Sequence, residues 1–279
     1  MRRNFAQILQ SGKVDYKKEY KKLYDLLFGG EMDINGEYHS TYTELSDSFT
    51  AFYFHGTYLT LQEFDEENGF NFPDPSKANP KFDDLILLME YFYNMLTGYM
   101  GANHLAFDNR INTQFLMQHI LEVSEAIGYT QASEDGFTVF VEKNAVVSAV
   151  AESELIPLEL SYKLITYDHH SMRGDLEGKK TIILRLAALL EAKKSILHQV
   201  NPNLENDLFY IFNNFNLRHN NCDSSAKGKY KHYIANMKKD DLENWYDEAY
   251  QMCLLAFMEI EQAARKPKFD AIKTEIEKK

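Results

Sequence analysis

The hydrophobic positions in the first part of the chain recur mainly at helical spacing. Residues 15 to 28 carry tyrosines and leucines three or four positions apart and are followed by Gly29-Gly30. This pattern predicts a helix that ends at the glycine pair, because glycine readily takes the left-handed conformation of a helix cap. Residues 82 to 97 are almost wholly apolar and predict a buried helix that stops at Gly98.

A further core helix is predicted in residues 112 to 128. Its buried face is expected to consist of Phe115, His119, Val123 and Ile127, with His119 as a hydrogen-bonded core residue. Residues 31 to 80 are rich in aromatic residues and have no clear period. Within them, Thr60 with Glu63 three positions later forms a capping box, which predicts a short helix after Thr60.

The hydrophobic period changes to two after residue 128. Phe137, Val139 and Val141 alternate with other residues behind the turn Glu134-Asp135-Gly136. Alternation next to such a turn predicts a β-hairpin near residues 129 to 143. The hairpin lies between helical segments, an order similar to a winged helix, but its acidic turn favours a packing role over contact with nucleic acid.

From about residue 155 the apolar positions predict four amphipathic helices with short connections. The four stripes are Leu155, Leu158, Tyr162 and Ile165; Ile182, Leu186, Leu189, Leu190, Ile196 and Leu197; Leu204, Leu208, Ile211, Phe212 and Phe215; and Leu242, Trp245, Tyr246, Ala249, Met252, Cys253, Ala256 and Ile260. Asp240 is expected to cap the fourth helix, with Glu243 three positions later. Four such helices close most simply as an antiparallel bundle.

These patterns predict a mainly α fold with two domains, which the length of 279 residues accommodates. An N-terminal helical domain with the β-hairpin is expected over residues 1 to 153. An antiparallel four-helix bundle is expected over residues 154 to 264. Residues 265 to 279 are expected to be a frayed tail or a peripheral helix.

The composition excludes several classes of protein. A hydrophobic content of 44% supplies a real core and excludes a disordered chain. No stretch resembles a signal peptide or a spanning helix, so a cytoplasmic protein without a membrane partner is expected. Cys222 and Cys253 are too few for a disulfide scaffold and are not at metal-ligand spacing, and no metal or other cofactor is expected. Without a glycine-rich phosphate loop or a nucleophile elbow, nucleotide hydrolysis and serine hydrolase chemistry are disfavoured.

The charge is distributed unevenly. The formal net charge of −12 repels polyanions and disfavours binding of nucleic acid by the whole surface. Residues 218 to 239 nevertheless carry a net charge of +5, from Arg218, Lys227, Lys229, Lys231, Lys238 and Lys239 against Asp223. A local basic loop is therefore predicted.

The stretch NNFNLRHNNCD, residues 213 to 223, lies at the predicted end of the third bundle helix. It combines side chains suited to phosphodiester chemistry. His219 is the candidate acid or base, Arg218 the candidate phosphate ligand and Asn214 the residue that orients a sugar hydroxyl or the imidazole. Substrate contacts are expected from Asn213, Asn220, Asn221, Lys227, Lys229 and Lys231. The partner predicted by this set is RNA.

A bundle with such a motif at the end of its third helix resembles the HEPN superfamily. The likeness covers about residues 155 to 262, where YDHHSMRGDLEGKK, the motif and LENWYDEAYQMCLLA resemble the C-terminal region of abortive-infection-type bacterial proteins. The family signature is an arginine, often a polar residue, and a histidine four to six positions later. Asn214 and His219 match it, Asn213 stands where the family has arginine, and Arg218 is displaced to the position before the histidine. The resemblance implies a metal-independent ribonuclease or an RNA-binding protein of phage defence, and a homodimer in which two motifs meet.

A second interpretation is a non-catalytic interaction or dimerisation module whose motif only caps the third helix. Asn213 in place of the family arginine favours this alternative. The neighbouring cluster of Asp168, His169 and His170 does not form a metal site on a helix, because adjacent residues point in different directions. His169 is interpreted as a partly buried, hydrogen-bonded structural residue.

Overall fold

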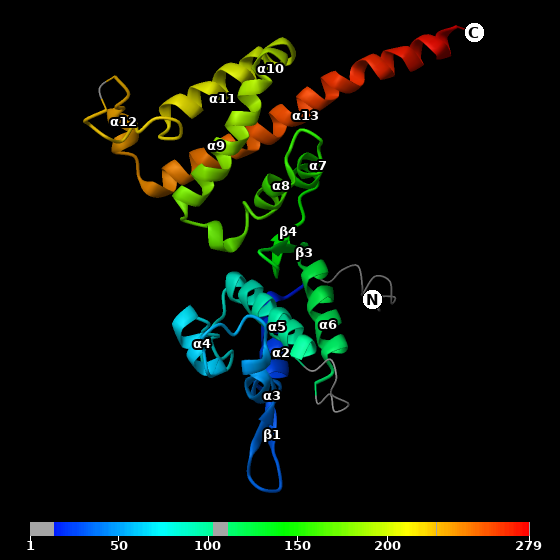
Figure 1. Cartoon of the computed structure of the whole chain (residues 1–279), viewed down its shortest axis with the longest axis vertical. Coiled ribbons are helices and arrows are strands. Elements are labelled where there is room, and N and C mark those ends of the chain that lie inside the picture. Colours follow the sequence, from blue (N-terminus) through cyan, green and yellow to red (C-terminus); the bar gives the residue numbers. More distant parts are fainter. Residues whose placement is uncertain (1–13, 103–110, 227, 279) are drawn as a thin grey trace, which may run out of the picture. The chain divides into compact units, whose positions relative to one another are not determined.

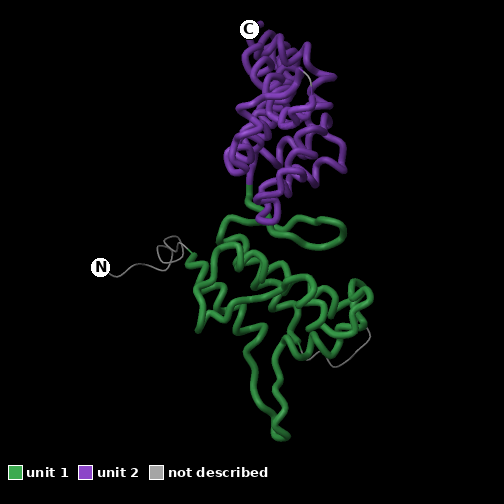
Figure 2. The backbone as a smooth tube through the Cα atoms, turned by 90° about the vertical axis from the view of Figure 1, so that its left-hand side faces the viewer, with its two compact units in different colours: residues 1–143 green, residues 144–279 purple. Residues whose placement is uncertain are grey.

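The computed structural model describes residues 14–102, 111–226 and 228–278. The chain divides into two compact units, Met1–Lys143 and Asn144–Lys279, which we call unit 1 and unit 2 (Figure 1, Figure 2). The described residues are mainly helical with two small antiparallel β-hairpins, which confirms the predicted mainly α class. Residues 144–153, assigned to the first domain from the hydrophobic pattern, lie in unit 2.

Unit 1 is built around one long buried helix. Its elements are α2 (Tyr16–Phe28), the hairpin of β1 (Gly30–Met32) and β2 (Tyr38–Ser40), α3 (Thr41–Ser48), the 3-10 turn η1 (Phe49–Ala51), α4 (Leu61–Asn68), α5 (Phe82–Ala102), α6 (Thr113–Ala126), and the hairpin of β3 (Tyr129–Glu134) and β4 (Phe137–Glu142). Helix α5 contacts α2, α3, α6 and β4. The buried residues of these elements therefore form one core around α5.

The predicted hairpin near residues 129 to 143 is confirmed. Strands β3 and β4 pair antiparallel around Asp135 and Gly136, which both have positive φ, as the tight hairpin turn requires. Two side chains of α5 attach the hairpin to the core. Asn94 accepts a hydrogen bond from the Thr138 amide and donates to the Thr138 carbonyl, and the Glu90 carboxylate accepts from the Phe140 amide at 2.7 Å.

The capping signals of unit 1 are partly confirmed. The Thr60 hydroxyl accepts a hydrogen bond from the Glu63 amide at the start of α4, as predicted, whereas the Glu63 carboxylate accepts from the Leu59 amide. Helix α2 ends at Phe28 as predicted, but the expected cap conformation is wrong, because Gly29 has φ −69° and is extended.

Two predictions about the helices of unit 1 are wrong. Helix α5 does not stop at Gly98 but continues to Ala102. Glycine at this position has a packing role, because a Cβ would lie 2.7 Å from the ring of Phe54 and 2.9 Å from that of Phe52. In α6 the buried face is Leu116, Ile120 and Val123. Phe115 is 57% exposed and stacks on the half-buried His119, which is therefore not a core residue.

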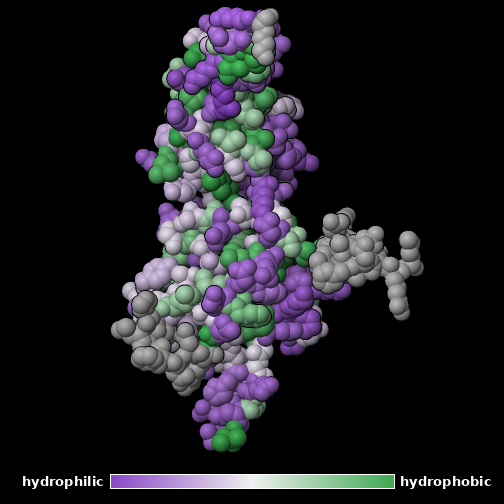
Figure 3. All heavy atoms as spheres, turned by 90° about the vertical axis from the view of Figure 1, so that its right-hand side faces the viewer, coloured by the Kyte–Doolittle hydropathy of each residue, from purple (hydrophilic) through white to green (hydrophobic). Residues whose placement is uncertain are grey.

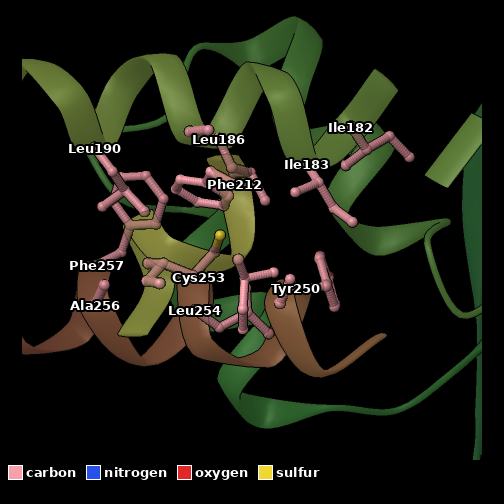
Figure 4. Packing of buried hydrophobic residues seen from close by; sticks show 14 of the residues in the cluster. Ile182, Ile183, Leu186, Leu190, Phe212, Tyr250, Cys253, Leu254, Ala256 and Phe257 are labelled. Carbon is pink, nitrogen blue, oxygen red and sulfur yellow. The ribbon is translucent and has the colours of Figure 1, made fainter. Parts of the chain in front are cut away.

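All regular secondary structure in the described residues of unit 2 is helical. Its elements are α7 (Ala145–Ala151), α8 (Leu158–Ile165), the 3-10 turn η2 (His170–Met172), α9 (Leu176–Ala192), α10 (Lys194–Val200), α11 (Pro202–Asn214), α12 (His232–Ala235) and α13 (Lys239–Glu277). Helix α13 contacts α7, α9, α10 and α11. Figure 4 shows apolar side chains of α9 meeting Phe212 of α11 and the Tyr250–Phe257 face of α13 in one core.

Four details of unit 2 differ from the sequence patterns. The buried face of α8 is Leu160 and Leu164, whereas Leu158 and Tyr162 of the predicted stripe are exposed. The second predicted helix is two helices, α9 and α10, which meet at Lys193. Asp240 does not cap α13, since the helix begins at residue 239 and Asp240 lies in its first turn. Of the two alternatives for the tail, a frayed segment is wrong for residues 265–277, which are helical and continue α13.

A partly buried ion-pair group joins α9 to α13, in which Lys179 is buried and both carboxylates are partly exposed. The Lys179 ammonium is 2.7 Å from both the Glu243 and the Asp247 carboxylates, and the Tyr167 hydroxyl donates to Asp247 at 3.0 Å. The Glu243 carboxylate also accepts from the Gly174 amide. Glu243 therefore holds the start of α9 in place and does not complete a capping box of its own helix.

The described surface is mixed in polarity. In Figure 3 hydrophobic side chains are scattered among hydrophilic ones over the visible face. Among the described residues, no helix combines the length and the apolar character needed to cross a membrane.

Candidate functional site

The motif of residues 213 to 223 forms the end of α11 and the start of the loop that leads to α12. The helix ends at Asn214, and Asn216 follows with a positive φ of 59°, a conformation that asparagine tolerates better than most residues. The Arg218 amide then donates to the Phe212 carbonyl at 2.9 Å. The chain therefore turns back on the last turn of α11, as expected for a capping segment.

Asn221 organises this loop. Its side chain is completely buried, accepts a hydrogen bond from the Asn216 amide at 2.9 Å and donates to the carbonyls of Asn213 and Lys229. Its own carbonyl accepts from the Lys231 amide at 2.8 Å. One asparagine thus satisfies a free carbonyl of α11 and joins both ends of the loop, so the structure gives it a structural role.

Arg218 lies against the body of unit 2. Its guanidinium forms an ion pair with Glu191 at 2.6 Å and donates to the Ala187 carbonyl at 3.3 Å. It also lies 5.2 Å from the ring centres of both Phe209 and Phe212. These contacts attach α9 to α11. They also engage the guanidinium that the sequence motif suggested as a phosphate ligand.

The other candidate catalytic residues lie in different settings. Asn214 donates to the Tyr210 carbonyl of its own helix at 2.8 Å. Asn220 is exposed and makes only a long 3.5 Å contact with Asp223. His219 is partly exposed, and within the described part of the chain its imidazole has no hydrogen-bonding or ionic partner. Of the three candidates for catalysis, only His219 has a reactive group that is not already engaged.

The described lysine side chains of the loop lie at the protein surface. Lys229 and Lys231 are exposed, and their backbones, rather than their side chains, bind Asn221. Lys238 and Lys239 are also exposed, while Lys227 lies outside the described residues. The one acidic residue of the loop, Asp223, is engaged by Ser225, whose hydroxyl and amide hold the pKa of Asp223 below its usual range.

A row of partly exposed aromatic side chains runs from the end of α11 to α13, the helices on either side of the segment that carries these lysines, and the periodicity did not indicate it. Tyr210 is 63% and Trp245 41% exposed, and the Phe215 ring lies between them, 6.5 Å from Tyr210 and 5.0 Å from Trp245. Trp245 also lines a hollow of about 680 Å³ together with His232 and Tyr233, which is 77% exposed. We call the set of Tyr210, Phe215, Tyr233, Trp245, Lys229 and Lys231 the aromatic–lysine surface.

Two further histidine groups lie outside the motif. His169 is buried, its Nδ1 lies 2.7 Å from the Ser171 hydroxyl and accepts from the Ser171 amide, which confirms its predicted role. In unit 1, Asp33, Glu37 and His39 bring three potential metal-ligand atoms within 4.8 Å of one another. The Asp33 carboxylate, however, already accepts the amides of the β1–β2 turn.

No protein-family model, curated protein or solved structure matches this chain. What unit 2 does must therefore be argued from its own surface and contacts.

Proposed function

We propose that unit 2 binds single-stranded RNA on the aromatic–lysine surface. The observation that carries the proposal is the row of partly exposed rings from Tyr210 through Phe215 to Trp245, in the same unit as the exposed Lys229 and Lys231 of the segment between α11 and α13. Aromatic rings that stack on bases, next to cations that contact phosphates, are the usual parts of a single-strand binding surface.

The magnitudes support contact with a short single strand. Stacking of one base on an exposed ring contributes about 1 to 3 kcal/mol. The lysines add contacts that weaken with salt. The net charge of −12 repels RNA from much of the remaining surface, so binding is expected to be confined to this region.

The resemblance to HEPN proteins belongs to the same proposal. The bundle it implies is supported by the packing of α9 and α11 on α13, and the motif occupies the end of α11. A role in phage defence rests on the resemblance alone and stays a prediction.

Fluorescence anisotropy with a labelled single-stranded RNA of about ten nucleotides tests the binding. Trp245→Ala is expected to weaken it about tenfold, since one stacked base is lost. Tyr162→Ala is the matched control, because Tyr162 is an aromatic residue of unit 2 that is 48% exposed on α8. Equal affinity of the wild type and Trp245→Ala, or no binding at low salt, would contradict the proposal.

RNA cleavage is a second candidate function, which the imidazole of His219 favours because no described residue engages it. Because Arg218 is paired with Glu191, cleavage would have to depend on His219 without that guanidinium. Incubation of labelled RNA with the wild type and His219→Ala in the presence of a chelator separates the two functions. Cleavage by the wild type alone supports catalysis, whereas equal cleavage or none leaves a binding protein.

The remaining alternative is an interaction module whose motif is purely a helix cap. It is supported by the contacts of Arg218 and Asn221. It predicts that His219→Ala and Trp245→Ala change neither RNA binding nor turnover, so the anisotropy measurement also distinguishes this alternative.

A further inference from the structure

Helix α13 carries an exposed stripe that its own unit does not cover. Figure 1 shows its last turns extending past the other helices of unit 2. Residues 264–278 are all exposed, including three large apolar side chains, Phe269, Ile272 and Ile276, which are 58%, 57% and 69% exposed. Such side chains are unusual on a free helix face.

The stripe has the spacing of a coiled coil. It begins on the packed part of α13 with Leu255 and Met258, which are 46% and 42% exposed. The whole stripe is Leu255, Met258, Gln262, Arg265, Phe269, Ile272 and Ile276, with steps of three and four residues in strict alternation. We call it the α13 stripe. An alternation of three and four is the a and d pattern of helices that wrap around each other with a left-handed supercoil.

We propose that a second copy of this chain covers the α13 stripe from Leu255 to Ile272, with the two α13 helices antiparallel. Leu255 then lies opposite the partner's Ile272, and Met258 opposite the partner's Phe269. Gln262 lies opposite the partner's Arg265. Two-fold symmetry repeats each of these pairs. The four apolar residues of each chain therefore meet apolar residues of the partner, and Gln262 and Arg265 meet each other. The shared segment of residues 255 to 272 is about 27 Å long.

The charged residues beside the stripe favour this register. It places Glu261 next to the partner's Lys268 and Glu259 next to the partner's Lys266, so each of the four flanking pairs joins opposite charges. Flanking pairs of this kind set the orientation and register of coiled coils. Glu261 now contacts Arg265 of its own helix, a surface pair that contributes little by itself.

Other arrangements are less favourable. A shift of the antiparallel pair by one heptad sets Arg265 opposite the partner's Phe269, and Lys268 next to the partner's Lys268. A parallel pair sets Arg265 opposite the partner's Arg265. Both arrangements place like charges together, which weakens association. Of the three arrangements, the antiparallel register above is the one that pairs apolar with apolar residues, polar with polar residues and opposite charges with each other between residues 255 and 272.

Pro267 is compatible with this arrangement. It lies inside α13 and removes one backbone hydrogen bond of the helix. In the α13 stripe its position is on the side away from the seam, so its ring does not enter the interface. The dimer does not depend on RNA binding, because the stripe shares no residue with the aromatic–lysine surface.

The mass of the full chain in solution tests the dimer. Light scattering after size exclusion at about 50 μM should give twice the 32.5 kDa of one chain. Phe269→Lys combined with Ile272→Lys should give the monomer. Leu158→Lys, at a leucine of unit 2 that is 69% exposed on α8, is the matched control and should remain a dimer. A monomeric wild type, or a double variant that stays dimeric, would overturn the proposal.

Charge exchange tests the register without altering the apolar seam. Lys268→Glu places like charges in two symmetric pairs and should weaken dimerisation about tenfold. Adding Glu261→Lys should restore it, and a double variant that is as weak as the single one would refute the pairing.

Cysteine cross-linking gives a second readout, in a chain that carries Cys222→Ser. Met258→Cys with Phe269→Cys should form covalent dimers on mild oxidation, because these positions face each other across the seam. Met258→Cys with Ile276→Cys should not form covalent dimers, since these two positions face each other only in the register shifted by one heptad. The opposite result would exclude the proposed register.

Discussion

Replacement of Asn221 by alanine is the most direct test of the structural role assigned to the loop after α11. The variant removes one accepted and two donated hydrogen bonds of a side chain that is completely buried. A buried hydrogen bond contributes about 0.5 to 1.5 kcal/mol net, so the three together amount to about 3 kcal/mol. In a unit of the length of residues 144–279, 1 kcal/mol corresponds to about 3 to 4 °C, and we expect the melting temperature of unit 2 to fall by about 10 °C.

The assay is thermal unfolding followed by tryptophan fluorescence. Trp245 is the only tryptophan of the chain and its ring contacts Phe215, so the signal reports unit 2 next to the loop. Asn220→Ala is the matched control, because the neighbouring asparagine is exposed and makes only a long contact, and its melting temperature should change by less than about 2 °C. Asn221→Asp should be intermediate, since a carboxylate keeps the acceptor but loses both donors. If Asn221→Ala melts within about 2 °C of the wild type, the loop is not held by this side chain.

Three further predictions concern the cores. Lys179→Met should destabilise unit 2 by about 3 kcal/mol in urea unfolding, because it leaves Glu243 and Asp247 without their cation. Burial lowers the pKa of Lys179, but its hydrogen bonds and attraction to Asp247 and Glu243 outweigh this effect and raise it, while the Lys179 and Gly174 contacts lower the pKa of Glu243. The stability from this group should therefore be lost below about pH 4.5, as Glu243 is protonated, and above about pH 10.5, as Lys179 is deprotonated, and the variant should show neither loss. Burial raises the pKa of Asp65 to about 6 against the hydrogen bonds of two tyrosines, so the folded state keeps a proton that the unfolded chain releases near pH 4. The stability of unit 1 should then fall by about 2 to 3 kcal/mol as the pH rises from 4 to 6, and Asp65→Asn should abolish that slope in hydrogen exchange of the α5 amides corrected for intrinsic rates. Gly98→Ala should destabilise unit 1 by about 1 to 2 kcal/mol through overlap with two phenylalanine rings, whereas Gly101→Ala, whose new methyl group meets no atom of the described residues, should stabilise it by about 0.5 kcal/mol in the same exchange experiment.

Local signals were sufficient to predict several elements. The turn at Asp135-Gly136 predicted the β3–β4 hairpin, and the hydroxyl of Thr60 predicted the start of α4. Both depend on residues within a few positions of one another, and their energetics are the same in most surroundings. The mainly α fold class of the chain was predicted from the same kind of local pattern.

The buried face of a short helix was less predictable when both faces carried apolar residues. In α8 the stripe through Leu158 and Tyr162 competes with the one through Leu160 and Leu164, and packing against other elements buries the second. Trp245 illustrates the same limit, because the apolar stripe of its helix includes it and yet its side chain is 41% exposed. A periodic pattern gives the spacing of a stripe but not the partner that covers it.

The sequence by itself determined the helical class, the hairpin, the basic loop and the position of the Arg-His-Asn motif next to the third long apolar run of the second half. Only the tertiary structure decided what those motif residues do: it buries Asn221 in the loop, pairs Arg218 with Glu191 and leaves His219 without a partner among the described residues. The physical reason is that capping and turn preferences act between neighbours in sequence. The partner of a long charged side chain, or the burial of an amide, depends on segments that folding brings together from distant parts of the chain.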